Sequence, residues 1–182
     1  KPGGKFLFIS SSEVYSGSKN IPHREDDIGL TNTTHKRSCY IEGKRCGEAI
    51  SFAFRNQGLA VKAARASLVY GPGTKKNDQR VLNEFIFKAL NGNITLMDAG
   101  EAKRTYCYVT DIVETLWSIL LFGKDFIYNV GGETKTTIAD LARKIGVRIN
   151  APVNIPQAAH GLSEAPDDVW LDLTKIKQEF SK

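Results

Sequence analysis

The pattern of apolar and polar positions predicts a strand, a long helix and a second strand at the start of the chain. The first apolar run stops at a cluster of three serines, which is typical of a short buried strand over 5–9. Over 38–56, apolar and small residues recur at helical spacing, and Gly58 follows in the position of a helix C-cap. The next apolar run, over 59–66, again predicts a strand.

The rest of the chain continues to alternate between short apolar runs and helical repeats. Two of the expected helices begin with capping boxes, which are opened by Asp111 and Thr137. The expected helices cover 78–90, 111–122, 137–146 and a short stretch from Thr174, and the expected strands cover 94–97, 104–108 and 126–130. Strands that alternate with helices form a parallel sheet with crossover helices, so the predicted fold class is α/β.

Composition and charge are those of an ordinary globular protein. The chain has 182 residues, 41% of them hydrophobic and 25% charged, and no run approaches the ~20 apolar residues that span a bilayer. The first residues lack the long apolar region of a signal peptide, so we expect a cytoplasmic protein without a membrane partner. The net charge of +5 comes from basic residues dispersed among acidic ones, which disfavours a nucleic-acid partner and suits an anionic small molecule.

The three cysteines, Cys39, Cys46 and Cys107, form neither a CxxC pair nor an even set. They therefore indicate no disulfide framework and no metal site. Cys39 and Cys46 are seven positions apart on the predicted helix, and we expect both to be reduced packing residues.

Tyr40 and Lys44 are four positions apart on the helix predicted over 38–56. Residues at this spacing lie one turn apart, roughly 5–6 Å between Cβ atoms, so the ammonium can lie beside the phenol and favour its ionised form. A tyrosine in this setting can act as an acid or a base. The spacing alone also arises by chance in a lysine-rich chain, as in Tyr15 and Lys19. The Ser-Gly-Ser between that pair predicts a turn, so we do not expect those two residues to meet.

A second polar group, Ser10, Ser11, Ser12 and Glu13, directly follows the first predicted strand. Open α/β sheets bind their ligands at the carboxyl ends of strands. Hydroxyl groups and a carboxylate at this edge can hydrogen-bond a hydroxylated ligand and transfer a proton. A serine-rich turn with a solvated Glu13 is the structural alternative.

Five segments, in chain order, resemble the active-site segments of extended short-chain dehydrogenases/reductases that act on nucleotide sugars. They cover 8–15, 37–45, 70–72, 77–81 and 103–111. The resemblance is closest to UDP-glucuronic acid decarboxylases, where a Ser-Glu pair and a Cys-Tyr-x-Glu-Gly-Lys-Arg run are typical; 4,6-dehydratases and 4-epimerases are close relatives. It implies an NAD-dependent enzyme that oxidises a nucleotide sugar at C4 and then decarboxylates, dehydrates or epimerises it.

The resemblance also implies a domain organisation. Residues 1–70 would form the C-terminal part of a dinucleotide-binding domain, with a doubly wound, Rossmann-like parallel sheet and the helix of the YxxxK motif. Residues 71–182 would mostly form a smaller α/β region that binds the nucleotide sugar, with some segments returning to the sheet. We expect a homodimer. Because no glycine-rich dinucleotide loop precedes these segments, we also expect a C-terminal fragment in which NAD binding is incomplete.

The resemblance assigns the first stage of the reaction to three residues. Tyr40 is implied as the base that removes the proton of the sugar 4-hydroxyl while hydride passes to NAD⁺. Lys44 is implied to assist Tyr40 and to hold the nicotinamide ribose, so both residues also contact the cofactor. Ser11 takes the place of the Ser/Thr that hydrogen-bonds the reacting sugar oxygen.

Four further residues have implied roles in the second stage and in substrate binding. Ser12 and Glu13 match the acid/base positions of the second stage, and Ser12 argues against a standard dehydration because dehydratases have Asp-Glu there. Arg80 and Arg104 are implied to bind the diphosphate or the sugar, for which the fork of donors in arginine is suited. Surface ion pairs are the structural alternative for each arginine.

Two departures leave the substrate and the outcome of the reaction open. Leu68 stands where the decarboxylases often have Asn, and Met97 and Asp98 stand where they usually have Tyr-Gly near the nucleobase. The alternative function is a non-catalytic protein that binds sugar nucleotides without the cofactor.

Overall fold

The computed structural model describes residues 3–75, 78–157 and 168–180, and it confirms the α/β class. The chain divides into two compact units, which we describe separately. The first unit comprises Lys1–Val69, Tyr106–Glu133 and Trp170–Lys182, and the second comprises Tyr70–Thr105 and Thr134–Val169. In the part of the chain that is described, no helix is both long and apolar enough to cross a membrane.

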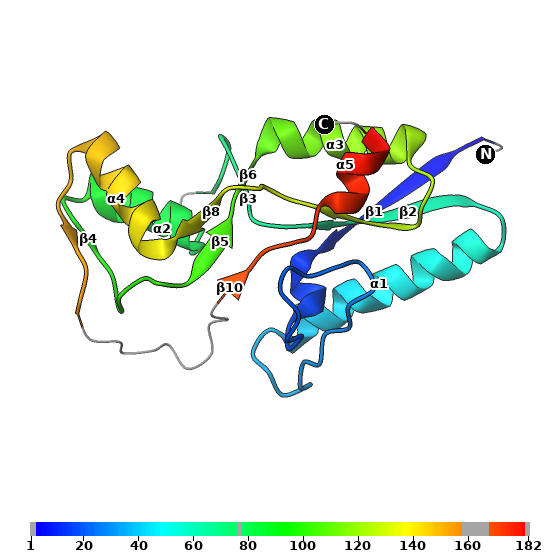
Figure 1. Ribbon diagram of the computed structural model, residues 1–182, viewed down its shortest axis with the longest axis horizontal. Helices are drawn as coiled ribbons and strands as arrows, with labels where there is room; N and C mark the ends of the chain where they lie inside the picture. Colours follow the sequence, from blue (N-terminus) through cyan, green and yellow to red (C-terminus); the bar gives the residue numbers. More distant parts are fainter. Residues whose placement is uncertain (1–2, 76–77, 158–167, 181–182) are drawn as a thin grey trace. The chain divides into compact units, whose positions relative to one another are not determined.

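A parallel sheet forms the centre of the first unit (Figure 1). Its strands are β1 (Lys5–Ser11), β2 (Ala60–Ala66) and β7 (Ile127–Val130), in the spatial order β1-β2-β7. The two helices α1 (Ser38–Asn56) and α3 (Val109–Phe122) lie on opposite faces of this sheet. The order of strand, helix and strand at the start of the chain is the crossover arrangement that the sequence predicts.

The carboxyl ends of the three strands meet at one edge of the sheet. Ser11 at the end of β1 is in register with Ala66 on β2, and Ala66 is in register with Val130 on β7. The chain leaves β1 at this edge and enters a short 3-10 helix, η1 (Ser12–Tyr15). The polar cluster that follows the first strand in the sequence therefore lies where open α/β sheets bind ligands.

Local sequence accounts for most of β1 and α1. The helix has the predicted bounds, and Gly58 after its end has a φ of +86°, a left-handed conformation that favours glycine. The first strand is two residues longer than predicted, because pairing with β2 continues to Ser11. Gly47 lets α1 approach the sheet closely, since a Cβ atom there would lie 2.2 Å from the ring of Phe8 on β1.

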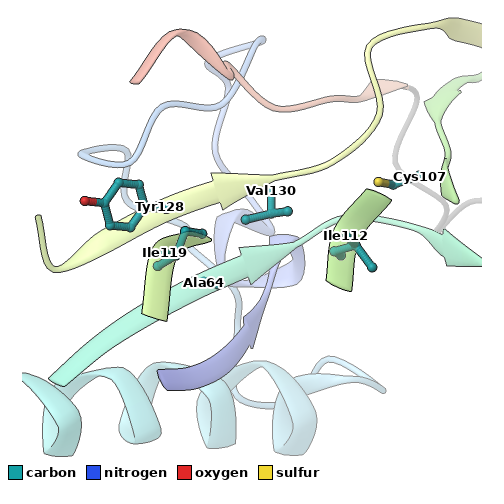
Figure 2. Packing of buried hydrophobic residues seen from close by; sticks show 6 residues of the cluster. All are labelled: Ala64, Cys107, Ile112, Ile119, Tyr128 and Val130. Atoms are coloured by element: carbon teal, nitrogen blue, oxygen red, sulfur yellow. The ribbon is translucent and has the colours of Figure 1, made fainter. Parts of the chain in front are cut away.

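The face of the sheet that α3 covers carries an apolar core (Figure 2). Its buried side chains come from β2, β6 (Cys107–Tyr108), α3 and β7: Ala64, Cys107, Ile112, Ile119, Tyr128 and Val130. The Tyr128 hydroxyl is satisfied, because it donates to Glu179 Oε2 at 2.8 Å and accepts from the Asp125 N–H at 2.7 Å. The first of these bonds attaches α5 (Thr174–Phe180) to the core.

The opposite face of the sheet carries a buried polar network. Arg65 on β2 donates two hydrogen bonds to Glu48 on α1, from Nε to Oε1 at 2.9 Å and from Nη2 to Oε2 at 2.7 Å. Its Nη1 donates to the Tyr15 hydroxyl at 2.7 Å, and that hydroxyl donates to Asn129 Oδ1 at 2.7 Å. The Ser10 hydroxyl on β1 donates to Glu48 Oε1 at 2.5 Å. The network thereby joins η1 and α1 to all three strands.

Full hydrogen bonding allows this network to hold charges in the interior. Glu48 and Arg65 are 7% and 8% exposed. Burial alone would lower the pKa of Arg65, but its interactions with Glu48 and Tyr15 raise that pKa above its ordinary value, so the guanidinium stays charged. Burial raises the pKa of Tyr15 to about 12, so its hydroxyl stays protonated and can donate. Since desolvating two charges is costly, the pair is tolerated only with this complete set of partners.

The second unit contains short sheets. In one, β5 (Lys103–Thr105) lies between β10 (Asp168–Val169), which is parallel to it, and β8 (Lys135–Thr137), which is antiparallel. In the other, β4 (Ile94–Thr95) pairs in parallel with β9 (Val153–Asn154). The proline- and alanine-rich stretch over 151–166, in which the sequence allows a loop with one strand, contains β9, and its residues 158–166 lie outside the described residues.

The helices of this unit, α2 (Val81–Leu90) and α4 (Ile138–Ile149), differ from the prediction at one end each. The start of α2 is later than expected, because the carboxylate of Asp78 accepts from the Arg80 N–H at 2.9 Å and forms a turn. Thr137 caps α4 as predicted, by accepting from the Asp140 N–H at 3.0 Å.

Gly146 does not end α4 as the sequence predicts. The helix continues to Ile149, and Asn150, with a φ of 57°, is its C-cap. Gly146 instead allows a close approach, since a Cβ atom there would lie 2.4 Å from Val153 Cγ2.

Three other expectations are wrong. Asp111 does not cap α3, which begins at Val109 without a side-chain cap; Asp111 lies in its first turn, where a carboxylate favours the helix dipole. The single strand expected over 104–108 is divided into two strands, because β5 ends at Thr105 and β6 begins at Cys107. A further short strand, β3 (Val69–Tyr70), was not expected. Cys39 and Cys46 are exposed and do not pack in a core.

His23, in the loop after η1, is a buried ionisable residue. Its ring stacks on the ring of Tyr15, with 4.9 Å between centroids and 9° between planes. Its main chain forms a parallel bridge with Leu171, through an N–H that donates to the Trp170 carbonyl at 3.0 Å. Burial lowers the pKa of His23 below the ordinary 6.5.

Replacing Glu48 by glutamine should strongly destabilise the protein. The substitution keeps the shape of the side chain and leaves the buried charge of Arg65 without its counter-charge. Removing one partner of a buried pair costs about 3–5 kcal/mol, so the free energy of unfolding in urea should fall by that order. The control is Arg143→Gln, which breaks an exposed pair with Asp140 and should cost less than about 1 kcal/mol. Equal losses in the two variants would contradict the account.

The stability of the protein should also depend on pH through His23. Because the folded protein holds His23 neutral at pH values where the unfolded chain protonates it, unfolding takes up a proton. The contribution of neutral His23 should be complete above the ordinary 6.5 and fall as pH decreases towards the folded pKa. For the one proton involved, the slope cannot exceed about 1.4 kcal/mol per pH unit. Urea denaturation at successive pH values should show a shallower slope in His23→Gln, and an unchanged slope would exclude His23 as the cause.

Candidate active site

The cluster at the carboxyl end of β1 has a defined geometry. Ser11 is buried and caps η1, because its Oγ accepts from the Glu13 N–H at 3.2 Å. As a hydroxyl it can still donate one hydrogen bond to a ligand. Ser12 and Glu13 occupy the first turn of η1 and are partly exposed. The segment is therefore a capped 3-10 turn.

Tyr40 and Lys44 meet on α1 as the spacing predicts. Lys44 Nζ lies 5.6 Å from the centroid of the Tyr40 ring and donates to the Ile9 carbonyl of β1 at 2.8 Å. Tyr40 is 43% exposed, so its phenol can be reached by a ligand. The bond to Ile9 holds the lysine side chain between α1 and the end of β1, beside the serine cluster.

Arg37 joins these two groups of residues. Its guanidinium binds both carboxylate oxygens of Glu13, with Nε to Oε2 and Nη2 to Oε1 each at 2.5 Å. Its Cζ lies 5.2 Å from the centroid of the Tyr40 ring, so cations flank that ring at Arg37 and at Lys44. Glu13 is therefore ion-paired, and its side chain stays 36% exposed. Arg37 is absent from the residues assigned from the sequence, because its partner is 24 positions away.

Tyr15 and Lys19 do not share a helix. Tyr15 ends η1 and is 1% exposed, and its carbonyl accepts from the Ser18 N–H at 2.8 Å in the turn that follows. Lys19 is exposed beyond that turn. The turn predicted from Ser-Gly-Ser is confirmed, and helical geometry distinguishes the Tyr40 pair from this one.

The two arginines assigned to substrate binding lie in the second unit, whereas the residues above lie in the first. Arg80 pairs with Asp78, with 2.5 Å between Nη2 and Oδ2, and these hydrogen bonds lower the pKa of Asp78 to about 2. Arg104 lies on β5, where its Nη1 donates to the Lys103 carbonyl at 2.7 Å. In the segment 77–81, which contains Arg80 and resembles the family, residue 77 lies outside the described residues.

The described residues contain no group of three or more His, Cys, Asp or Glu side chains that could hold a metal ion. The cluster offers groups for proton transfer and hydrogen bonding: one phenol, whose ring two cations approach, two hydroxyls, and one carboxylate that is paired with Arg37.

Comparison with known proteins places the chain in a family. The model described as "NAD dependent epimerase/dehydratase family" matches residues 1–131. The chain belongs to this family. Curated relatives include UDP-glucuronic acid decarboxylase 5 of Arabidopsis thaliana, 33% identical over 181 residues, which cover 97% of this chain and 52% of the relative. UDP-glucuronic acid decarboxylase 1 of Xenopus tropicalis is 34% identical over 168 residues, or 91% of this chain and 39% of the relative.

Solved structures of epimerases and dehydratases have the same fold. A UDP-N-acetylglucosamine 4-epimerase from Methanobrevibacter ruminantium M1, in complex with UDP-N-acetylmuramic acid, has a TM-score of 0.83 and 25% identity. The match covers 98% of this chain and 57% of that one. A dTDP-glucose 4,6-dehydratase from Bacillus anthracis, in complex with NAD, has a TM-score of 0.78 and 22% identity, over 98% of this chain and 56% of that one.

These similarities confirm the family resemblance drawn from the sequence. They also confirm that UDP-glucuronic acid decarboxylases are among the similar proteins. The epimerase/dehydratase chain described here spans about half the length of the first curated relatives, 52% in the case of decarboxylase 5.

Proposed function

We propose that the protein containing this chain oxidises a nucleotide sugar at C4 with NAD⁺, using Tyr40 as the base. The observation that carries the proposal is the position of Lys44 Nζ, 5.6 Å from the Tyr40 ring centroid on a helix beside the carboxyl end of β1. Tyr40, as a phenolate that the adjacent ammonium stabilises, takes the proton of the 4-hydroxyl and becomes a neutral phenol. Ser11 donates a hydrogen bond to the reacting sugar oxygen and orients it.

The residues around Lys44 fit a nicotinamide ribose. An ammonium has three N–H donors, and among the described residues Lys44 donates one hydrogen bond, to the Ile9 carbonyl, so donors remain for ribose hydroxyls. Bound NAD⁺ would supply the hydride acceptor that oxidation of the 4-hydroxyl to a ketone requires. Tyr40 and Lys44 would hold the nicotinamide end of the cofactor.

The proposed substrate is UDP-glucuronate, and the proposed second stage is decarboxylation. This choice rests on the named activity of the curated relatives and on the Ser12-Glu13 pair. A ketone at C4 is β to the carboxylate carbon, so the carbon–carbon bond can break with release of CO₂ while its electrons move onto the ketone oxygen. Ser12 and Glu13 lie at the ligand-binding edge, where they can hydrogen-bond the sugar during this step.

We assign the first unit to the cofactor and the reacting sugar, and the second unit to the rest of the substrate. Arg80 and Arg104 are the proposed diphosphate or sugar ligands, because a guanidinium can bind two phosphate oxygens at once. To bind a ligand in this way, Arg80 would exchange its bonds to Asp78 for bonds to the substrate.

Replacing Tyr40 by phenylalanine in the full-length protein should lower turnover selectively. The change keeps the ring between Arg37 and Lys44 and removes only the hydroxyl. Loss of a general base lowers kcat by about 10²–10⁴-fold, whereas KM should change little. Turnover can be followed by CO₂ release from UDP-glucuronate.

Tyr15→Phe is the control for Tyr40→Phe, because it removes the same hydroxyl group from a buried tyrosine. It should lower the melting temperature, because Arg65 and Asn129 each lose a partner, and it should reduce turnover far less than Tyr40→Phe. Wild-type turnover in Tyr40→Phe would refute the proposed base. Binding of UDP-glucuronate without any turnover in the unmodified protein would favour the non-catalytic alternative.

We also propose a homodimer that forms through α1. Ile50 and Phe54 are one turn apart on this helix and are 54% and 47% exposed. Two copies of such a stripe can pack against each other around a two-fold axis. Sedimentation should show a dimer that Ile50→Glu converts to monomer, while Val147→Glu, on an exposed valine of the second unit, should leave the dimer intact. A monomeric unmodified protein would refute this proposal.

A further inference from the structure

Arg37 and Glu13 form a two-point contact between η1 and the start of α1. Arg37 directly precedes α1, and Glu13 lies in the first turn of η1. The two nitrogen–oxygen contacts run in parallel, Nε to Oε2 and Nη2 to Oε1, and each is 2.5 Å long. A planar guanidinium that binds both oxygens fixes the direction of the carboxylate as well as its distance.

The same guanidinium also lies against Tyr40. Its Cζ is 5.2 Å from the Tyr40 ring centroid, which is within the range of a cation–π contact. Arg37 therefore holds the carboxylate of Glu13 beside the tyrosine that the proposed function uses as a base. Neither stage of the proposed reaction, oxidation at C4 or decarboxylation, has required Arg37 so far.

Glu13 needs such a partner if it is to have one orientation. Its side chain is 36% exposed and that of Arg37 is 56% exposed, so packing alone leaves both free to rotate. The contact to Glu13 raises the pKa of Arg37, mainly through the hydrogen bond. Bound in this way, Glu13 is an anion that can only accept hydrogen bonds.

We propose that Arg37 is the positioning residue that fixes Glu13 as an oriented anion beside Tyr40, and that turnover depends on this contact. The proposal rests on the proposed function, because it gives Glu13 the second-stage role described there. Arg37 acts through Glu13 and does not itself react.

The competing interpretation is a surface ion pair without function. Exposed pairs contribute little to stability, and many contribute nothing measurable. The two interpretations differ in what happens to turnover when the pair is broken while the fold remains intact.

The contact itself can be tested by NMR of the full-length protein. The Nε–H proton of Arg37 should give a downfield resonance that exchanges slowly with water, because it is held by a carboxylate. In Glu13→Gln this resonance should move upfield and exchange rapidly. A resonance that does not respond to Glu13→Gln would overturn the proposal, whatever reaction the protein catalyses.

The dependence of turnover can be tested by a double-mutant cycle with Arg37→Gln and Glu13→Gln. Misplacing a reacting group by about 1 Å can cost roughly 10²-fold, so each single variant should lose kcat by that order with little change in KM. The double variant should be no slower than the slower single variant, because both changes remove the same contact. Arg37→Lys should recover only part of the turnover, since lysine lacks the fork of donors.

Chemical rescue separates a positional role from a structural one. Guanidinium ion at low concentration should restore part of the turnover of Arg37→Ala. It should have no such effect on Arg143→Gln, a matched exposed arginine variant whose turnover should equal that of the unmodified protein.

Tyr40→Phe, assayed in parallel, distinguishes the two possible failures. If Tyr40→Phe loses turnover while Arg37→Gln keeps it, the positioning proposal is wrong and the proposed function stands. If both variants keep wild-type turnover, the proposed base is wrong as well. Additive losses in the double variant would also overturn the proposal, because they would show that Arg37 does not act through Glu13.

Discussion

The buried ion pair of Glu48 and Arg65 is the interaction on which the first unit depends. It lies on the face of the sheet opposite the apolar core and connects α1 to β2 through two parallel hydrogen bonds. Because a buried charge is tolerated only with a full set of partners, the pair also constrains the groups that satisfy it. Ser10 and Tyr15 are two of those groups, and they lie on either side of Ser11, Ser12 and Glu13. The segment that follows β1, which holds the candidate site residues, is thereby anchored on both sides by the buried network.

The site above this network has a different character. Its own ion pair, Arg37 with Glu13, is partly exposed, so a ligand can reach it. A buried pair below and a solvent-accessible pair above suit the proposed site, which must keep its geometry and still admit a charged substrate. Lys44 is also both anchored and accessible: one of its N–H donors binds the Ile9 carbonyl of β1, and the others remain for a ligand.

Local patterns in the sequence predict much of the fold and part of the site. The helix over 38–56 and the strand before it follow from apolar spacing, and the meeting of Tyr40 and Lys44 follows from four-residue helical spacing. Contacts between distant residues do not follow from such patterns. Arg65 and Glu48 are 17 positions apart on different elements, and Tyr15 and Asn129 are 114 apart, so only the folded chain shows that they meet.

The errors also have physical reasons. A glycine in this position usually marks the end of a helix, but α4 continues past Gly146. Glycine is needed there because Val153 approaches the helix closely. Asp111 has the signal of an N-cap, yet an acidic residue is equally favourable inside the first turn, where the helix dipole stabilises it. Both residues show that one residue type can satisfy two different constraints near a helix terminus.

The central proposal is that the protein oxidises a nucleotide sugar with NAD⁺, and that Tyr40 is the base in this oxidation. The most direct measurement is rapid mixing of the full-length protein, saturated with NAD⁺, with UDP-glucuronate, while NADH absorbance and CO₂ release are followed together. The account predicts that NADH forms in the first turnover and that CO₂ is released after it. Tight binding of UDP-glucuronate with no NADH and complete recovery of the unchanged sugar nucleotide would contradict it.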